Sequence, residues 1–208
     1  MRCLLFVASL LFSFPAVAQM VVPFTTPDGR VACTQGMTGL GRPPDWQGVA
    51  DPDGPDGWAL AELAGDANDL RFPLCISEPA VARDFDATLR FKPVSGMRAQ
   101  VAGLMFRAQD ANDYYVVRAN ALDNSVRLYR MDKGKRRQIA SKEAPIAADK
   151  WHSLRVVVLN DRFEVGLDGK PLFEVNDRSL LQPGAMGLWS QADSVTHYGS
   201  LLVGLPMR

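Results

Sequence analysis

The eight residues YYVVRANA, from Tyr114 to Ala121, combine aromatic rings, a guanidinium and an amide in one short stretch. Side chains of a β-strand alternate between its two faces, so Tyr114, Arg118 and Asn120 share one face. A flat ring can stack on the apolar C–H face of a pyranose, and Arg or Asn can hydrogen-bond to its hydroxyls. The composition of this face therefore suits a sugar.

The same alternation on other segments offers further side chains for this face. We predict a ligand-binding surface in which Arg107, Arg118 and Asn120 bond to hydroxyls and Tyr114 or Trp189 is the stacking platform. The alternative is that the basic side chains only cover a solvated sheet with their stems while Trp189 fills the core. The complete predicted set is Lys92, Arg107, Tyr114, Arg118, Asn120, Trp189 and Gln191.

Carboxylates give little support for catalysis. A glycosidase of the usual kind needs two carboxyl groups flanking the scissile bond, and the chain has five Glu residues, none in an E-x-D-x-x-E pattern. Glu164 and Glu174 lie on neighbouring predicted strands and could approach each other, or could simply be polar residues on a solvated face. We therefore assign no catalytic residue.

Metal and cofactor motifs are weak as well. His152 and His197 are far apart in sequence, so no zinc site is predicted. Asp110, Asn112 and Asp113 carry oxygen ligands that calcium accepts, but a turn capped by side chains explains them better. The chain shows no P-loop and no dinucleotide fingerprint, and we predict no cofactor.

The first 19 residues, MRCLLFVASLLFSFPAVAQ, have the basic start, apolar run and small-residue end of a secretory signal peptide. Residues 1–18 are predicted to be that peptide, because the apolar run is shorter than the roughly 20 residues that span a bilayer. No later stretch is long and apolar enough to span. We expect a secreted or periplasmic protein that makes no membrane contact after cleavage.

Export changes how the cysteines are interpreted. Cys33 and Cys75 are the pair left after cleavage, and an even pair in an oxidising compartment predicts a disulfide. Two separately buried thiols are the alternative.

Net charge argues against a nucleic-acid partner. Of 23 basic and 23 acidic residues, cleavage removes one Arg, which leaves 22 minus 23, or −1. The single basic run, KGKRR from Lys133 to Arg137, is interpreted as a solvated hairpin turn.

Residues 19–57 are rich in Pro, Gly and Asp and predict an irregular N-terminal segment. Residues 58–208 contain about a dozen short alternating segments separated by turn residues, of which Asp168-Gly169 is the strongest signal. This pattern predicts one all-β domain, an antiparallel two-sheet jelly-roll sandwich, with a closed barrel as the alternative. The alternation of apolar residues within each segment predicts a core that includes Phe91, Phe106, Leu128, Val156 and Leu188.

The strings RFPLCISEP, DFDATLRFKPVSG, GLMFRAQDANDYYVVRANALDNSVRLYRMDKGKRRQIA, WHSLRVVVLNDRFEVGLDGKPLFEV and GAMGLWSQADSVTHYGSLLV carry a family resemblance over roughly residues 70 to 203. The chain resembles secreted bacterial domains of the concanavalin A-like lectin/glucanase superfamily, closest to the 3-keto-disaccharide hydrolase (glycoside-hydrolase-like, laminin-G-like) family. The resemblance implies a curved two-sheet sandwich whose concave face handles carbohydrate. Two departures are the segment from His197 to Ser200, where relatives carry an aromatic and acidic residues, and the cysteine pair.

The sequence is therefore compatible with three functions. The leading hypothesis is a domain that binds an oligo- or polysaccharide non-covalently on its concave face. The alternatives are a glycan-directed hydrolase or lyase of the resembled family, and a cell-envelope interaction module without a sugar ligand. A converging carboxylate pair would separate the first two, since fold alone does not decide function.

Overall fold

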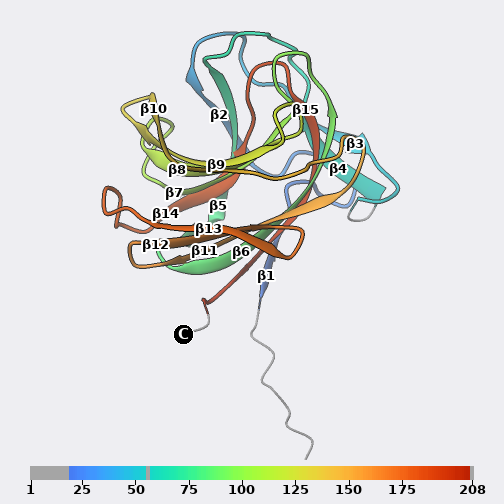
Figure 1. Cartoon of the computed structure of the whole chain (residues 1–208). Coiled ribbons are helices and arrows are strands. Elements are labelled where there is room, and N and C mark those ends of the chain that lie inside the picture. Colours follow the sequence, from blue (N-terminus) through green and yellow to red (C-terminus); the bar gives the residue numbers. More distant parts are fainter. Residues whose placement is uncertain (1–18, 55–56, 207–208) are drawn as a thin grey trace, which may run out of the picture.

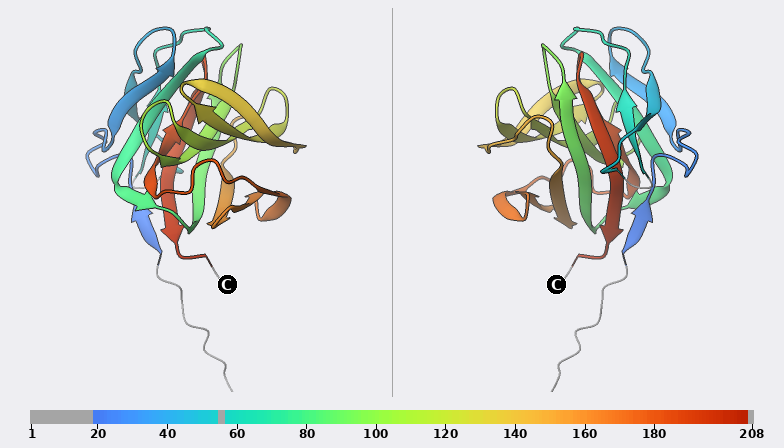
Figure 2. Two further views of the ribbon diagram at one scale, coloured as in Figure 1. Left: turned by 90° about the vertical axis from the view of Figure 1, so that its left-hand side faces the viewer. Right: turned by 90° about the vertical axis from the view of Figure 1, so that its right-hand side faces the viewer.

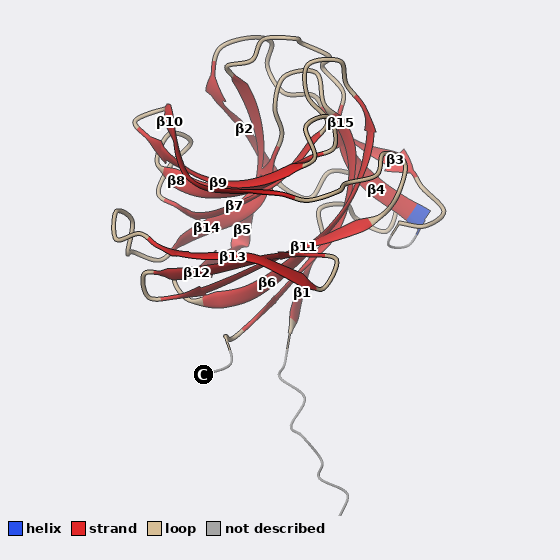
Figure 3. Ribbon diagram, viewed as in Figure 1, coloured by secondary structure: helices blue, strands red, loops and turns tan. Residues whose placement is uncertain are grey.

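The computed structural model describes residues 19–54 and 57–206. Strands make up most of this part of the chain (Figure 3). They form two antiparallel sheets packed face to face, which confirms the predicted sandwich. The predicted signal peptide, residues 1–18, lies outside the described residues.

One sheet has eight strands among the described residues. Its order is β13 (Lys170–Asn176), β12 (Arg162–Leu167), β11 (His152–Leu159), β6 (Phe85–Ser95), β15 (Val195–Gly204), β4 (Trp58–Glu62) and β3 (Trp46–Ala50), with β1 (Met20–Val22) also pairing with β15. Figure 2 shows β1 beside β15 at the lower edge of the sandwich.

The other sheet has seven strands in the described chain. Its order is β10 (Lys135–Glu143), β9 (Ser125–Asp132), β8 (Tyr114–Asn120), β7 (Val101–Ala108), β14 (Gly184–Trp189), β5 (Arg71–Ala82) and β2 (Thr34–Gly39). The two layers face each other in Figure 1.

The side chains that point into the core between the sheets are those that the alternation predicts. Tyr115, Val117 and Ala119 of β8 point into it and are fully buried. Burying a large apolar side chain contributes about 1.5–3 kcal/mol, so this layer is the main source of stability. All five predicted core residues are buried in the same cluster, which confirms the prediction: Phe91, Phe106, Leu128, Val156 and Leu188.

The predicted Asp168-Gly169 hairpin is also confirmed. Leu167 pairs with Lys170, and the two residues between them have φ of 49° and 75°. Positive φ at both central positions is the type I′ geometry, which matches the twist of the flanking strands. Glycine at the second position adopts this conformation without a steric penalty.

The described part of residues 19–57 is more regular than its composition predicts, because it contains β1, β2 and β3. β2 pairs only with β5, and β3 only with β4, so both are edge strands whose side chains show no regular alternation of burial. Such short edge strands carry a weak periodic signal. No helix in residues 19–54 or 57–206 is long and apolar enough to cross a membrane.

The Cys33–Cys75 disulfide is present, as predicted, with the two Cα atoms 5.5 Å apart. Cys75 lies in β5 and is fully buried, and Cys33 directly precedes β2. The bond therefore ties the N-terminal segment to the seven-stranded sheet. A disulfide is consistent with a location outside the cytoplasm.

The seven-stranded sheet curls strongly. Its two edges, β2 and β10, rise on either side of its outer face (Figure 1). A Cβ at Gly134, in the turn between β9 and β10, would lie 3.9 Å from the Thr38 methyl of β2, so the opposite edges nearly meet there. We call this curved outer face the concave face. It holds a second buried cluster, which includes Phe72, Met105, Tyr114, Val116, Tyr129 and Trp189.

Candidate functional site

Aromatic side chains form the floor of the concave face. Trp189 stacks on Phe72 with ring centroids 5.2 Å apart and 17° between the planes. Trp189 Nε1 donates a hydrogen bond to the Tyr114 hydroxyl at 3.1 Å, and that hydroxyl also bonds to the Thr38 hydroxyl at 2.8 Å. Burial raises the pKa of Tyr114 to about 12. Neither predicted stacking ring is exposed, and their polar atoms are satisfied by one another.

Space for the indole comes from β7. A Cβ at Gly103 would lie 2.9 Å from Trp189 Cβ and from its backbone oxygen and 3.0 Å from the indole Cε3. A larger residue there would displace both the indole and the neighbouring backbone. Gly103 pairs with Trp189 on one side and with Arg118 on the other. The sheet register therefore places the indole and the guanidinium side chain on either side of a position without a side chain.

Arg136 covers the aromatic floor from above. Its guanidinium carbon lies 4.9 Å from the Phe72 ring centroid and 4.8 Å from that of Tyr129. Its Nη1 donates to Gln191 Oε1 at 2.9 Å, which joins edge strand β10 to the segment after β14. The interpretation of the basic run as a solvated turn was wrong for this residue: the turn is at Lys133 and Gly134, and Arg136 lies across the concave face.

Arg118 is buried, with 4% of its surface exposed. Its Nη2 lies 3.4 Å from Asp123 Oδ2 and 3.5 Å from the Tyr129 hydroxyl, both at the long limit of a hydrogen bond. Its Nε and Nη1 atoms are buried and have no hydrogen-bond partner. Buried polar groups are nearly always bonded, so two free donors on one guanidinium require an explanation.

Arg127 stands beside Arg118 on the neighbouring strand, at the opposite position of the register. It contacts the same two partners: Nη2 lies 3.1 Å from Asp123 Oδ2 and Nη1 lies 3.5 Å from the Tyr129 hydroxyl. Its Nε is buried and unpartnered. About a third of the Arg127 and Asp123 side chains is exposed, so this end of the concave face meets solvent.

Asp123 is held in the ionised state. Burial alone would raise its pKa, but the hydrogen bond from the Ser125 hydroxyl and the nearby Arg118 outweigh that effect and lower the pKa. The Ser125 contact is 2.6 Å. The carboxylate is therefore a fixed negative charge between two guanidinium groups. We call Arg118, Arg127 and Arg136, with Tyr129 and Asp123, the arginine cluster.

Asn120 sits where β8 ends, next to the cluster in the sheet. Its Oδ1 accepts hydrogen bonds from the backbone N–H groups of Gln100 at 3.1 Å and Leu122 at 3.2 Å. The amide therefore caps the turn that follows β8, which gives it a structural task in addition to its place on the concave face.

The expectation that Arg107 shares this face was wrong. Its φ is 48° at a β-bulge between β7 and β14, and a bulge re-aims the side chain that it carries. The guanidinium instead donates to the backbone oxygens of Arg83 at 2.8 Å, Leu180 at 2.9 Å and Asn160 at 2.5 Å. Arg107 is fully buried and joins three loops at the edge of the sandwich.

The expectation for Lys92 was wrong as well, because β6 belongs to the other sheet. Its Nζ forms a 2.5 Å ion pair with Asp51 and lies 5.4 Å from the centroid of Trp151. Which strands share a sheet cannot be deduced from alternation within each strand.

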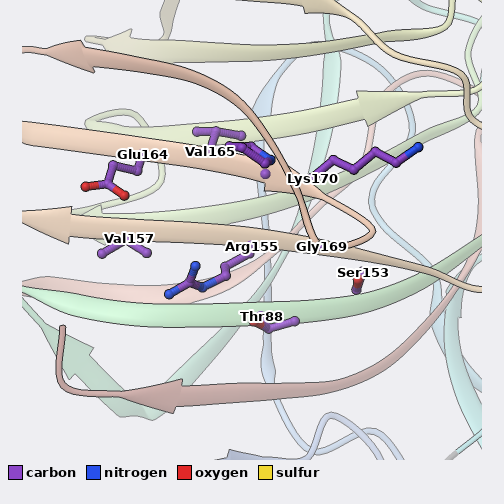
Figure 4. Close-up of a pocket in the computed structure, with 10 residues that line it drawn as sticks. Thr88, Ser153, Arg155, Val157, Glu164, Val165, Gly169 and Lys170 are labelled. Atoms are coloured by element: carbon purple, nitrogen blue, oxygen red, sulfur yellow. The ribbon is translucent and has the colours of Figure 1, made fainter. Parts of the chain in front are cut away.

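A separate cavity of about 410 Å³ lies on the outer face of the eight-stranded sheet (Figure 4). Glu164 and Arg155 point into this region from neighbouring strands. Glu164 and Glu174 are directly opposite in the register, and Arg162 contacts both at 3.0 and 2.6 Å. The two carboxylates are thus close, as their positions allowed, but one guanidinium pairs with both on an exposed surface.

Of the seven predicted ligand-binding residues, five lie together on or beside the concave face: Tyr114, Arg118, Asn120, Trp189 and Gln191. Sequence reasoning missed Arg127, Tyr129 and Arg136. The signal for the first two was available, since both alternate against the core residue Leu128 in SVRLYRM. Within the described ranges, no group of three His, Cys, Asp or Glu side chains could hold a metal ion.

Comparison with known proteins identifies relatives of the domain that carries this site. A levanase of Bacillus subtilis is 28% identical over 105 residues, which cover 50% of this chain and only 15% of the levanase. The carbohydrate-binding module CBM66 from Bacillus subtilis is 25% identical with a TM-score of 0.58, over 78% of this chain and 93% of the module.

A Bacillus subtilis protein of unknown function with a galectin-like fold gives a TM-score of 0.64 at 13% identity, over 91% of this chain and 96% of that protein. This likeness concerns the fold alone and agrees with the two-sheet architecture. The model of the 3-keto-alpha-glucoside-1,2-lyase-like domain matches residues 45–198, which include every strand from β3 to β14 and therefore the whole arginine cluster. The match covers more than half of the sequence and confirms the resemblance: this chain belongs to the 3-keto-alpha-glucoside-1,2-lyase-like domain family.

Proposed function

We propose that this protein binds carbohydrate non-covalently at the Arg118 end of its concave face, and that it does so outside the cytoplasm as a secreted or periplasmic domain. The observation that carries the proposal is the buried Arg118 guanidinium, whose Nε and Nη1 have no partner among residues 19–54 and 57–206. Donors fixed in place before binding can bond to sugar hydroxyls without a further loss of side-chain freedom.

Two further observations support a sugar ligand. The similar module CBM66 is named as a carbohydrate-binding module. Around Arg118, the Tyr129 hydroxyl, the Asp123 carboxylate and the Arg127 guanidinium supply both donors and acceptors, which a polyhydroxylated ligand requires. The buried Trp189 and Tyr114 rings would serve as a rigid floor, and stacking on them would require Arg136 to move.

The test begins with a glycan array of the chain without residues 1–18, followed by calorimetry on each hit. Arg118→Met keeps most of the packed stem and removes all donors, so we expect a loss of affinity of about 1–3 kcal/mol. Arg118→Lys keeps the charge but not the planar fork, and should lose nearly as much if the contact is bidentate. Thermal melts run in parallel, because a residue that is 4% exposed also contributes packing.

Unchanged affinity in both variants, with a folded protein, would remove Arg118 from the binding site. Catalysis is the alternative function, and the family description of a lyase-like domain is what favours it. Product analysis of every array hit after prolonged incubation distinguishes the two: a binding protein returns the glycan intact, and a lyase or hydrolase returns shortened or unsaturated products. A chain that binds no glycan on the array would favour the cell-envelope interaction module.

A further inference from the structure

The arginine cluster carries an imbalance of charge. Three guanidinium groups, Arg118, Arg127 and Arg136, surround the Tyr129 ring and hydroxyl. Asp123 is the carboxylate that pairs with two of them. Three positive charges and one negative charge leave a local excess of +2. Glu143, another carboxylate, lies opposite Ser125 on the edge strand and is exposed.

Two of the three guanidinium groups, those of Arg118 and Arg127, also lack a full set of hydrogen-bond acceptors among the described residues. Arg118 has one long ion pair at 3.4 Å, and the bonds of Arg118 and Arg127 to Tyr129 are both 3.5 Å. Three buried donors remain unpartnered: Nε and Nη1 of Arg118 and Nε of Arg127. A buried guanidinium without a full set of acceptors costs free energy, which a bound acceptor would recover.

The directions of the pKa shifts of Tyr129 and Arg136 agree with a strong positive field in the cluster. Burial alone would raise the pKa of the Tyr129 hydroxyl, yet Arg118, Arg127 and Arg136 outweigh it and lower the pKa. Burial lowers the pKa of Arg136, and the charges of Arg118 and Arg127 lower it further despite the opposing effect of Tyr129. The guanidinium groups therefore repel one another in this site.

We propose that the ligand of this site is an acidic sugar, one whose carboxylate or sulfate group is held by Arg118 and Arg127. The inference rests on the proposed function and specifies the class of glycan. Carboxylates and sulfates accept two parallel N–H bonds from a guanidinium, and Arg is favoured over Lys wherever such planar recognition occurs. A ligand would approach from solvent at the exposed third of the Arg127 and Asp123 side chains. A neutral sugar would leave the charge excess uncompensated.

The test compares ligands that differ only in charge. Calorimetry on the chain without residues 1–18 uses trigalacturonate against its methyl ester, and a sulfated galactose oligosaccharide against its desulfated form. We expect at least one acidic ligand to bind about tenfold more tightly than its neutral counterpart, the effect of one charge-assisted hydrogen bond. Its affinity should fall as salt rises from 50 to 500 mM, whereas that of the neutral form should hardly change.

Variants assign the effect to residues. Arg127→Met should remove most of the preference for the acidic ligand. Arg137→Met is the matched control, because Arg137 is the neighbour of Arg136 on β10, is 62% exposed and pairs with Asp132 away from the cluster. The salt dependence of the unaltered protein does not rely on any variant folding.

The outcomes separate the two proposals. Neutral sugars that bind as tightly as their acidic counterparts overturn the acidic-sugar inference and leave carbohydrate binding intact. No binding of any sugar, acidic or neutral, overturns both. Binding of inorganic sulfate alone, as tight as that of the sulfated sugar, also overturns the inference, because the cluster would then be a simple anion site.

Discussion

Tyr114, Trp189 and Thr38 form a small buried hydrogen-bond network under the arginine cluster. The Tyr114 hydroxyl receives the indole N–H of Trp189 and bonds to the Thr38 hydroxyl, and all three side chains are fully buried. Such a network fixes ring orientation, because a buried donor that loses its acceptor incurs the full desolvation penalty. The floor of the concave face is therefore rigid.

Tyr114→Phe tests that network at the scale of one oxygen atom. We expect the free energy of unfolding to fall by about 1–3 kcal/mol, because Trp189 Nε1 loses its only bonded acceptor. Urea unfolding measures it. Tyr129→Phe is the control, since the Tyr129 hydroxyl makes only 3.5 Å contacts, and its loss should cost under about 1 kcal/mol. Equal losses in the two variants would contradict the assigned role.

At the scale of elements, the alternation of apolar residues in the sequence reliably predicted which side chains of a strand are buried. Phe106, Leu128 and Leu188 are buried as predicted, and the predicted Asp168-Gly169 turn joins β12 to β13. This alternation depends only on the backbone of each strand, so one sequence reveals it. The five residues that share the concave face were found in this way.

Other features of the elements depend on contacts far apart in sequence. The placement of Lys92 failed because pairing between strands decides the sheet, and that of Arg107 failed because a β-bulge reverses the local direction of the side chain. The sequence allowed a buried Trp189 in the core, but it could not reveal burial on the concave face, because that requires the sheet to curl until Arg136 reaches Phe72. Curling is a property of the assembled sheet.

The β12–β13 hairpin offers a test of turn geometry. Gly169 has φ of 75°, and a Cβ there would meet nothing within 4 Å, so Gly169→Ala introduces backbone strain without a clash. We expect a loss of about 1–2 kcal/mol in the free energy of unfolding. Gly36→Ala in β2 is the matched control, because its Cβ would make ordinary contacts at 3.8 Å. It should be neutral or stabilising by up to about 1 kcal/mol, and a loss as large as that of Gly169→Ala would rule out strain as the cause.

At the scale of the whole molecule, a buried carboxylate joins three parts of the eight-stranded sheet that are far apart in the sequence. Asp51, which follows β3, bonds to Lys92 Nζ of β6 at 2.5 Å and to His197 Nδ1 of β15 at 2.6 Å. Burial would raise its pKa, but the bonds to His197, Lys92 and the Asp53 N–H outweigh it and the pKa is lowered. The ionised form is therefore more stable in the folded protein than in the unfolded chain.

The sign of the pH dependence follows from that lowered pKa. The contribution of Asp51 is fully present above its unfolded pKa of about 3.9 and is lost as the pH falls through the lower folded value. Asp51→Asn should cost roughly 2 kcal/mol at pH 7, and the difference from the unaltered protein should shrink below about pH 4. Chemical unfolding from pH 2.5 to 7 measures it. A difference that stays constant over this range would show that the charge of Asp51 does not matter.

The position of β15 also bears on how the molecule is made. β15 is the last strand of the described chain, yet it lies inside the eight-stranded sheet between β6 and β4 and also pairs with β1. During translation every other described strand leaves the ribosome first. Until β15 emerges, the sheet consists of three separate pieces, which are β13 to β6, β4 with β3, and β1, and the edges of β6 and β4 are unpaired. Contacts between distant parts of a chain form slowly, and unpaired edges invite aggregation. Newly made chains would therefore need protection until β15 joins the three pieces.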